Sequence, residues 1–234
     1  MIPKKIHYCW FGGKPLPPLA EKCIASWKKY CPDYEIIRWD ESNYDFSKHP
    51  FMKQAYQEKK WAFVTDYARL DIIYNNGGLY FDTDVELLRS PDTLLSNSLF
   101  VGFENEQFVN TGQVFGGEAG HIILKKLRDD YDNILFSSSN LIPCPQIQTR
   151  TLKSLGLQDD TGEIQFLPAD TAIYPTEYFC PKHGWFNRYK LTSNTYSIHH
   201  CAASWLSRTG KLKSKLNKLI GYDNYSKLKR LLRK

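Results

Sequence analysis

The sequence predicts an α/β fold, in which helices pack on a central sheet. Residues 2–39 have the pattern of a strand, a helix and a strand, and residues 61–86 have that of a helix that stops at a double glycine and continues as an apolar strand. At 234 residues, with 42% hydrophobic and 24% charged residues, the chain is long enough for one well-filled core. We therefore expect one α/β domain.

The first unit is indicated by its apolar spacing. Residues 2–11 alternate in hydrophobicity, which predicts a strand with His7 and Cys9 on one face. Three further elements are expected after it. They are a helix, a second strand, and a loop with a short helix, at residues 19–30, 35–39 and 42–60.

Residues 61–86 carry the clearest pattern. Apolar side chains recur at helical steps and share one face: Phe63, Tyr67, Leu70 and Ile73. Asp66 and Arg69 are three residues apart and share a different face. Gly77 suits the left-handed conformation that ends a helix, and the apolar strand 79–81 follows at once.

Asp82 and Asp84 come directly after this strand, at the carboxyl end where α/β sheets bind ligands. In an extended chain residues i and i+2 point the same way, so the two carboxylates are expected side by side. Because unpaired carboxylates repel each other, the pair predicts a divalent cation between them and a phosphorylated ligand. The alternative for Asp-x-Asp is a solvated turn, and the preceding helix and strand favour the cation site.

The rest of the chain predicts further strands and one helix. The expected strands are 85–88, 99–103, 164–167 and 196–199, residues 108–117 are expected to form a hairpin or a strand, and the expected helix is 118–131. The glycines of 108–117 indicate a close backbone approach, and Asn110 is expected to face the cleft. Residues 143–160 show no pattern that predicts an element.

Two adjacent histidines, His199 and His200, end the last expected strand. Imidazole is a good ligand for a borderline cation such as Mn²⁺. Because the carboxylate pair already predicts a cation, we expect one histidine to bind it, with His200 as the first choice. The alternative for a single histidine is a structural role in the core.

The basic charge lies in the C-terminal tail. Residues 207–234 hold ten Lys or Arg and one Asp, whereas the rest of the chain holds 21 basic and 24 acidic residues. Leucines at helical spacing predict an amphipathic tail that either lies on an anionic membrane surface or packs on the domain. The tail lacks an aromatic-basic surface for nucleic acid, so no nucleic-acid partner is expected.

The cysteines and the N-terminal residues indicate the cellular compartment in which the protein is expected. The six cysteines show neither a metal-pair nor a disulfide-framework spacing, so we expect reduced and mostly buried thiols. The N-terminal residues lack the apolar core of a signal peptide, and no stretch reaches the length of a membrane span. We therefore expect a cytoplasmic protein.

Three blocks of the sequence resemble the DXD-containing glycosyltransferases of family 32. They are IPKKIHYCWFGG at 2–13, FVTDYARLDIIYNNGGLYFDTDV at 63–85 and HHCAASW at 199–205. That family includes yeast α-mannosyltransferases, animal α1,4-galactosyltransferases and bacterial capsule enzymes. The chain is also similar, more distantly, to the glucosyltransferase domains of large clostridial toxins.

The resemblance implies a GT-A fold, with a single Rossmann-like domain and a mixed sheet over residues 1–206 and the basic tail over 207–234. It implies a retaining, Mn²⁺- or Mg²⁺-dependent glycosyltransferase that moves a sugar from a UDP- or GDP-linked donor to a saccharide acceptor. We expect a role in bacterial cell-surface polysaccharide synthesis, of capsule or lipopolysaccharide. A lipid-linked acceptor would place the protein at the inner membrane face.

The resemblance also implies roles for individual residues. Trp10 would stack on the base, and His7 and Cys9 would line the nucleoside pocket largely through their backbone. The implied catalytic residues are Asp66, Arg69, Asp82 and Asp84, and the implied metal ligands are Asp82, Asp84 and one of His199 and His200. The implied nucleotide-sugar contacts are His7, Cys9, Trp10, Tyr80, Asn110, Ser204 and Trp205.

Two other functions fit parts of the sequence. LYFDTDV superficially resembles the motif of haloacid-dehalogenase-type phosphatases, in which Asp82 would attack phosphate. That motif normally ends the first strand of its domain, whereas here a complete strand-helix-strand unit precedes it. A non-catalytic nucleotide-sugar-binding module is the second alternative. No Asp or Glu stands out as a covalent nucleophile, which favours same-face attack by the acceptor hydroxyl over a glycosyl-enzyme intermediate.

Overall fold

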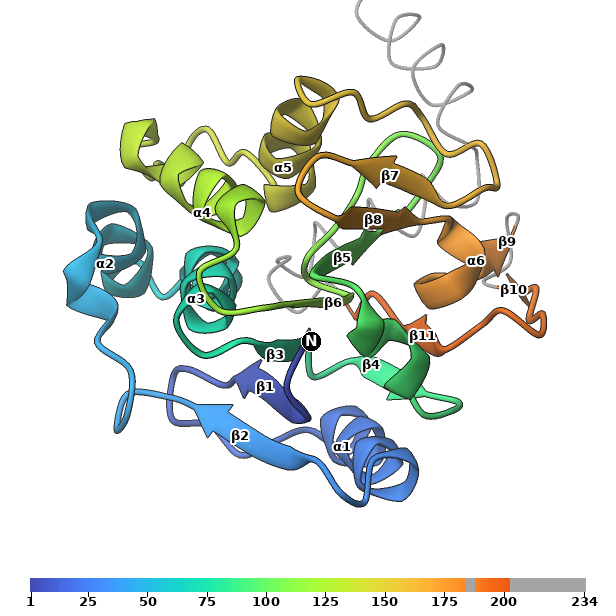
Figure 1. Cartoon of the computed structure of the whole chain (residues 1–234). Coiled ribbons are helices and arrows are strands. Elements are labelled where there is room, and N and C mark those ends of the chain that lie inside the picture. Colours follow the sequence, from blue (N-terminus) through green and yellow to red (C-terminus); the bar gives the residue numbers. More distant parts are fainter. Residues whose placement is uncertain (184–187, 203–234) are drawn as a thin grey trace, which may run out of the picture.

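A seven-stranded mixed sheet forms the centre of the molecule, in the order β2-β1-β3-β6-β5-β8-β7 (Figure 1). The structure is a computed structural model that describes residues 1–183 and 188–202. β1 is parallel to β2 and β3, β6 is antiparallel to β3 and β5, β5 is parallel to β8, and β7 is antiparallel to β8. The strands of this sheet are β1 Lys5–Cys9, β2 Glu35–Trp39, β3 Gly78–Phe81, β5 Leu99–Gly102, β6 Val114–Gly117, β7 Gln165–Leu167 and β8 Thr171–Tyr174.

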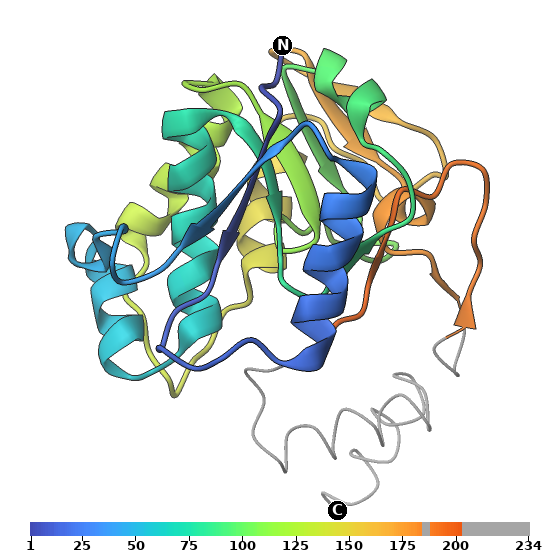
Figure 2. The ribbon, with the colours of Figure 1, turned by 90° about the horizontal axis from the view of Figure 1, so that it is seen from below.

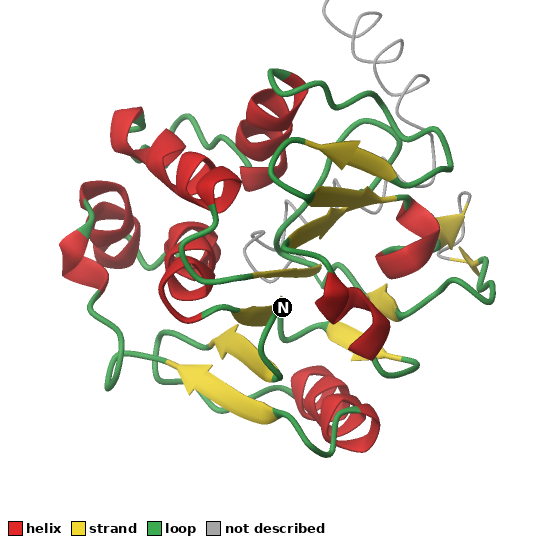
Figure 3. Cartoon of the chain, viewed as in Figure 1, coloured by secondary structure: helices red, strands yellow, loops and turns green. Residues whose placement is uncertain are grey.

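Helices cover both faces of the sheet, as the sequence predicts (Figures 1 and 3). One face packs against α2, α3, α4 and α5, and the other packs against α1, α6 and the short helix η2. The helices are α1 Pro18–Tyr30, α2 Pro50–Gln57, α3 Trp61–Asn76, α4 Ile122–Asp129, α5 Cys144–Lys153 and α6 Thr176–Phe179, with one-turn helices η1 Phe46–Lys48, η2 Asp92–Ser96 and η3 Asp130–Asn133.

Alternation along the strands divides the core into two layers. In β3, Tyr80 packs with α3, whereas Leu79 and Phe81 pack with α1. In β1, Cys9 belongs to the α3 side and Tyr8 to the α1 side. The predicted β1-α1-β2 unit is therefore confirmed. Figure 2 shows β1 running away from the N-terminus, so the carboxyl ends of β1 and its parallel neighbour β3 lie at the opposite end of the sheet.

Helix α3 is buried on every side rather than along one stripe. All residues from Phe63 to Ile73 are buried, because α3 lies beneath the sheet with α2 and α4 packed on its flanks. Asp66 and Arg69, expected on a different face from the apolar residues, are buried as well. Gly77 ends the helix with a φ of 64°, as predicted.

Three elements differ from the sequence expectation. The helix expected over residues 118–131 begins only at Ile122, because Gly120 has a φ of 75° and the ring of His121 accepts a hydrogen bond from the Ile123 amide at 3.3 Å, which caps the helix. Helix α5 was not expected, although a proline in its first turn is a typical helix start. Strand β8, which is completely buried, was also not expected.

A small two-stranded sheet lies beside the central one. β4 (Val85–Leu87) pairs antiparallel with β11 (Ser197–His199), with Val85 opposite His199. The fully buried Trp27 of α1 donates a hydrogen bond from its indole nitrogen to the Val85 carbonyl at 2.7 Å, which fixes β4 against α1. A hairpin of β9 (Lys182–His183) and β10 (Arg188–Tyr189) precedes β11.

The tail expected over residues 207–234 lies outside the described residues, so its helical structure and the domain boundary at 206 stay predictions. Within residues 1–183 and 188–202, no helix is both long enough and apolar enough to cross a membrane.

Gly116 is expected to be essential for packing the centre of the sheet. A Cβ at this position would lie 2.4 Å from Leu79 Cδ2 and 2.8 Å from Phe100 Cε1. We expect Gly116→Ala to lower the free energy of unfolding by about 1–3 kcal/mol, because the core cannot accept the extra methyl group. The matched control is Gly117→Ala on the other face, whose Cβ would meet only Leu99 Cδ1 within 3.0 Å. Urea denaturation measures both, and equal losses would contradict this packing.

Candidate active site

The two aspartates lie in a tight turn between β3 and β4. The Val85 amide donates a hydrogen bond to the Asp82 carbonyl at 3.0 Å, so Asp82 and Asp84 are not in the extended arrangement that the sequence predicts. The turn still brings their carboxylates together with a third donor. Oxygen atoms of Asp82 and Asp84 and a ring nitrogen of His199 all lie within 4.8 Å of one another.

The pairing of β11 with β4 positions His199. His199 Nε2 lies 3.4 Å from Asp84 Oδ1. The backbone after β11 also holds Asp84, because the His200 amide donates to the Asp84 carbonyl at 3.0 Å and the Ala202 amide donates to Asp84 Oδ2 at 2.7 Å. Asp84 is therefore fixed by a chain segment more than a hundred residues away.

His200 lies with a different carboxylate. Its Nε2 is 2.9 Å from Glu86 Oε2, and Glu86 also pairs with Lys22 at 2.8 Å. The hydroxyl of Tyr189 is 3.4 Å from His200 Nδ1. The geometry therefore favours His199 over His200 as the histidine of the carboxylate site. Which of them binds a metal stays a prediction.

Arg69 joins the α3 residues to the aspartate turn. Its Nη2 lies 3.0 Å from Asp66 Oδ1 and 3.5 Å from Asp82 Oδ1, and its Nε donates to the Thr65 carbonyl at 3.1 Å. The side chain is only 3% exposed. The buried guanidinium therefore bridges two of the carboxylates that the sequence singled out, and it holds one oxygen of Asp82 in place.

Tyr80 and Cys9 are buried beside Arg69 and Asp82. The Tyr80 hydroxyl donates to Asp82 Oδ1 at 3.1 Å, and the Arg69 guanidinium lies 5.3 Å from the centre of the Tyr80 ring. Burial raises the pKa of the Cys9 thiol to about 12, which keeps the thiol neutral. Both residues therefore lie near the site, but as buried parts of the core.

Asn110 faces the same site across Gly112. Its Oδ1 accepts the Gly112 amide at 2.6 Å, and its Nδ2 donates to Glu104 Oε2 at 2.9 Å. A Cβ on Gly112 would lie 2.3 Å from Arg69 Nη1 and 2.8 Å from Asp82 Oδ2. The close backbone approach predicted for this segment occurs at Gly112, where only a glycine leaves space beside the carboxylate.

His7 has a fully buried side chain. Trp39 Nε1 donates to His7 Nδ1 at 3.0 Å, so His7 Nε2 carries the proton and donates to the Gly77 carbonyl at 3.0 Å. Burial lowers the pKa of His7 to about 4. Both ring nitrogens are engaged within the protein, which leaves the backbone as the part of His7 that could face a nucleoside.

The remaining residues of the expected nucleotide site are only partly described. Trp10 follows β1 and is half-buried, and its indole nitrogen donates to the Lys14 carbonyl at 2.6 Å. Ser204 and Trp205 lie outside the described residues. The nucleotide-contact roles of these residues stay predictions.

The donor set of Asp82, Asp84 and His199 fits a divalent cation. Opposite ligands of an octahedral Mg²⁺ are about 4.2 Å apart, and the three donor atoms are within 4.8 Å of one another, so small side-chain rotations would bring them to one ion. Carboxylate oxygens suit both Mn²⁺ and Mg²⁺, and the imidazole favours Mn²⁺, the softer of the two.

The two aspartates have opposite pKa shifts. Burial raises the pKa of Asp82 to about 6, and the positive charge of Arg69 only partly offsets it. Burial acts the same way on Asp84, but the charge of His199 and the hydrogen bonds from His199 and Ala202 outweigh it and lower the pKa of Asp84 to about 2. Without a cation, Asp82 is therefore the strained carboxylate and Asp84 the stabilised one.

Sequence reasoning missed several neighbours of the site. Glu104 and Cys144 both contact Asn110, with Cys144 Sγ 3.6 Å from Asn110 Oδ1, and neither has a local pattern that would mark it. They reach the site from a loop and from the start of α5, so only the tertiary structure reveals them. Gly112, by contrast, lies in the segment whose glycines the sequence had marked.

We expect Asp82→Asn to stabilise the protein when divalent metal has been removed. The folded-state pKa of about 6 lies above the ordinary value of 3.8, so the folded state binds more protons than the unfolded state between these values. Stability of the parent protein therefore falls as pH rises through this window. The variant should gain about 2–3 kcal/mol at pH 7 and nothing below about pH 4, measured by urea denaturation in a chelator.

The matched variant Asp84→Asn should act in the opposite direction. The folded-state pKa of Asp84, about 2, lies below 3.8, so its contribution is present above about pH 4 and is lost as pH falls through 2. We expect a loss of about 2 kcal/mol at pH 7. Shifts of the same sign in both variants would contradict the proposed difference between the two carboxylates.

Comparison with known proteins supports the resemblance seen in the sequence. Residues 17–101 match the family described as "Glycosyltransferase sugar-binding region containing DXD motif". Inositol phosphoceramide mannosyltransferase 3 of Schizosaccharomyces pombe is 31% identical over 53% of this chain and 35% of its own length. Inositol phosphoceramide mannosyltransferase 1 of the same organism is 27% identical over 47% of this chain and 39% of its own length. The chain thus spans little more than a third of these relatives.

The fold has a relative among solved structures. The glycosyltransferase PaToxG superposes with a TM-score of 0.53 and 18% identity, over 65% of this chain and 69% of that chain. At this identity the likeness concerns the fold, and it confirms the predicted GT-A architecture. Residues 17–101 are therefore similar to the sugar-binding region of the DXD-containing glycosyltransferases, and they lie within an α/β domain of the GT-A type.

Proposed function

We propose that this protein is a metal-dependent glycosyltransferase that uses a nucleotide-sugar donor. The observation that carries the proposal is the convergence of Asp82, Asp84 and His199 at the end of β3, where the two aspartates belong to the region that matches the DXD family. These three residues would hold a Mn²⁺ or Mg²⁺ ion. When bound, such an ion neutralises the negative charge that grows on a departing diphosphate.

Arg69 and Tyr80 act in this proposal as positioning residues. Both contact Asp82 Oδ1, at 3.5 Å and 3.1 Å, which directs the other carboxylate oxygen toward Gly112 and away from the helix. Arg69 bridges Asp66 and Asp82. Its positive charge is therefore largely balanced by these two carboxylates. We infer that it stabilises the ionised form of Asp82 needed for metal binding.

Asp66 is a poor candidate for a covalent nucleophile. It is 10% exposed and paired with Arg69 at 3.0 Å, and burial raises its pKa. This arrangement supports the expectation that the acceptor hydroxyl attacks on the same face from which the diphosphate leaves, with retention of configuration. It also gives no support to the phosphatase alternative, because Asp82 Oδ1 is held by Tyr80 and Arg69.

The acceptor that we propose is a saccharide or polyol headgroup carried on a lipid. Two relatives are named for mannosyl transfer to inositol phosphoceramide, which is such a lipid. The sequence resemblance suggests that such an acceptor would serve the assembly of a bacterial cell-surface polysaccharide. The basic tail of residues 207–234 is the part of the chain proposed to contact the membrane.

The central test compares two adjacent histidines. A panel of UDP- and GDP-sugars with Mn²⁺ is screened for donor hydrolysis and for transfer, with the anomeric configuration of products determined by NMR. We expect His199→Gln to lower kcat by about 100-fold or more, because a group that stabilises developing charge is lost. His200→Gln, which removes the contact with Glu86, should lose far less. Equal losses, or full activity in both variants, would remove His199 from the metal site.

A second experiment tests membrane contact. The full chain and a chain ending at residue 210 are floated with liposomes that contain phosphatidylglycerol, and with neutral liposomes as the control. We expect the full chain to float with anionic liposomes at low salt and to be released as salt rises, because the tail is strongly basic. Flotation that is the same with and without the tail would disprove its role.

A further inference from the structure

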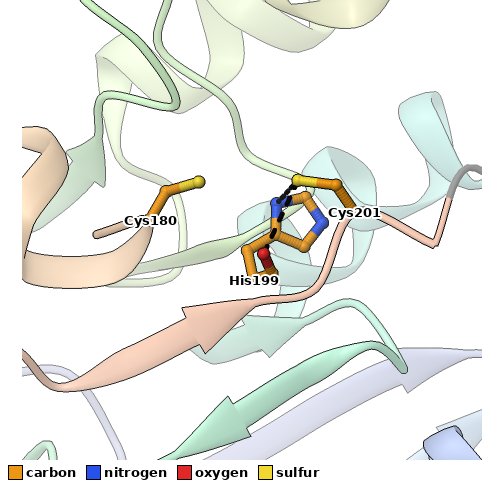
Figure 4. A group of neighbouring side chains, drawn as sticks. All are labelled: Cys180, His199 and Cys201. Carbon is orange, nitrogen blue, oxygen red and sulfur yellow. Dashed lines mark hydrogen bonds between the residues drawn. The ribbon is translucent and has the colours of Figure 1, made fainter. Parts of the chain in front are cut away.

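A second group of metal donors lies directly beside the carboxylate site. Its members are Cys180, His199 and Cys201, whose sulfur and nitrogen atoms all lie within 4.8 Å of one another. Figure 4 shows the two thiols pointing toward each other, with the His199 ring directly beside the sulfur of Cys201. His199 therefore has Nε2 directed at Asp84 and Nδ1 directed at the thiols.

The spacing of this group matches the ligand shell of a tetrahedral zinc. With Zn–S bonds of about 2.3 Å and Zn–N bonds of about 2.05 Å, a sulfur and a nitrogen ligand are about 3.6 Å apart and two sulfur ligands about 3.8 Å apart. Cys201 Sγ lies 3.5 Å from His199 Nδ1. No large movement is needed for these two atoms to share one ion.

The backbone holds the thiols in this position. Cys201 has a φ of 48°, an unusual value for a residue other than glycine, and this turn of the chain places its sulfur next to the ring of His199. Cys180 directly follows α6, and the Ser197 hydroxyl donates to the Phe179 carbonyl at 3.2 Å, which ties the end of α6 to β11. Both sulfurs are thus presented by segments that are already joined.

We propose that Cys180, Cys201 and the Nδ1 atom of His199 bind Zn²⁺, with solvent as the fourth ligand. Thiolates and imidazole are the ligands that Zn²⁺ prefers, whereas Mn²⁺ and Mg²⁺ prefer oxygen. Binding releases the two thiol protons and the Nδ1 proton of His199 to solvent, so that the ion is held by two thiolates and the Nδ1 lone pair. Cys201 is half-buried, which leaves an approach for the ion and for the fourth ligand.

The other cysteines offer no comparable site. Within the described part of the chain, Cys9, Cys23, Cys31 and Cys144 belong to no group of three donors. The combination of two sulfurs and one ring nitrogen thus occurs where α6 and β11 end. A Zn²⁺ ion there would cross-link these two ends and fix the ring of His199, whose other nitrogen faces Asp84 at 3.4 Å.

The site goes beyond the proposed function and is tested without an activity assay. Metal-free protein is titrated with Co²⁺ in place of Zn²⁺, because thiolate ligands give Co²⁺ a charge-transfer absorption band that oxygen ligands do not. We expect this band at one equivalent of Co²⁺, its loss when Zn²⁺ displaces Co²⁺, and a rise in Tm with Zn²⁺ alone.

Variants locate the site. Cys201→Ser should abolish the band and weaken Zn²⁺ binding by more than about 100-fold, which exceeds the usual effect of residues behind the ligands. The matched control is Cys31→Ser, which alters a thiol as buried as that of Cys180, each being 1% exposed. Cys31→Ser should keep the band. Asp84→Asn should also keep it, because Asp84 is not a ligand of this site, and this result would stand even if the glycosyltransferase proposal failed.

Two outcomes would overturn the proposal. One is the absence of a thiolate band in the parent protein, which does not depend on the folding of any variant. The other is a band and a Zn²⁺ affinity that persist in the double variant of Cys180→Ser and Cys201→Ser, because the thiolates would then come from elsewhere in the chain.

Discussion

The antiparallel pairing of β4 with β11 is the interaction on which the site depends. It places Val85 opposite His199, so that the residue before Val85, Asp84, receives two backbone hydrogen bonds from the segment after β11. Without this pairing Asp84 would be a carboxylate in a solvated turn. The pairing in turn rests on α1, whose Trp27 holds the Val85 carbonyl. The proposed cation site therefore depends on the packing of α1 as well as on the pairing of β11.

Charge balance within the interior is the second constraint. Asp66, Asp82 and Asp84 are gathered in a small region, and Arg69 and His199 are the cations that neutralise them. Arg69 alone does not compensate Asp82 fully, as the raised pKa of Asp82 shows. An ionised carboxylate that destabilises the metal-free protein is stabilised most when a divalent cation binds to it. Local instability at a functional site is the usual cost of such a preformed arrangement.

In the two proposals, one ring, that of His199, faces two kinds of metal site. Its Nε2 lies among carboxylates, which suit a hard cation, and its Nδ1 lies among thiols, which suit a soft one. A group bound to one nitrogen of an imidazole fixes the orientation and the proton of the other. Whatever binds Nδ1 on the side of the thiols therefore influences the orientation of the His199 ring and the proton on the nitrogen that faces Asp84.

Much of the fold could be predicted from local pattern. The alternation in β1, the helical spacing of α1 and α3, the glycine stop at Gly77 and the strand that leads into Asp82 all depend on residues close in sequence. Helix α5 and strand β8 were missed because the residues that form them gave no clear period. The sequence alone thus predicted the α/β sheet and the position of the carboxylate pair at its edge, whereas the ligand of that pair stays a prediction.

The tertiary structure alone decided how these residues meet. It favoured His199 over His200, because the choice depends on the register of β11 against a strand more than a hundred residues earlier. It buried Arg69 between two carboxylates, because α3 is covered by the sheet on one side and by helices on the others. It also brought Cys180 to Cys201. Contacts of this kind arise from the packing of segments that are distant in sequence, and no local period of hydrophobic or polar residues records them.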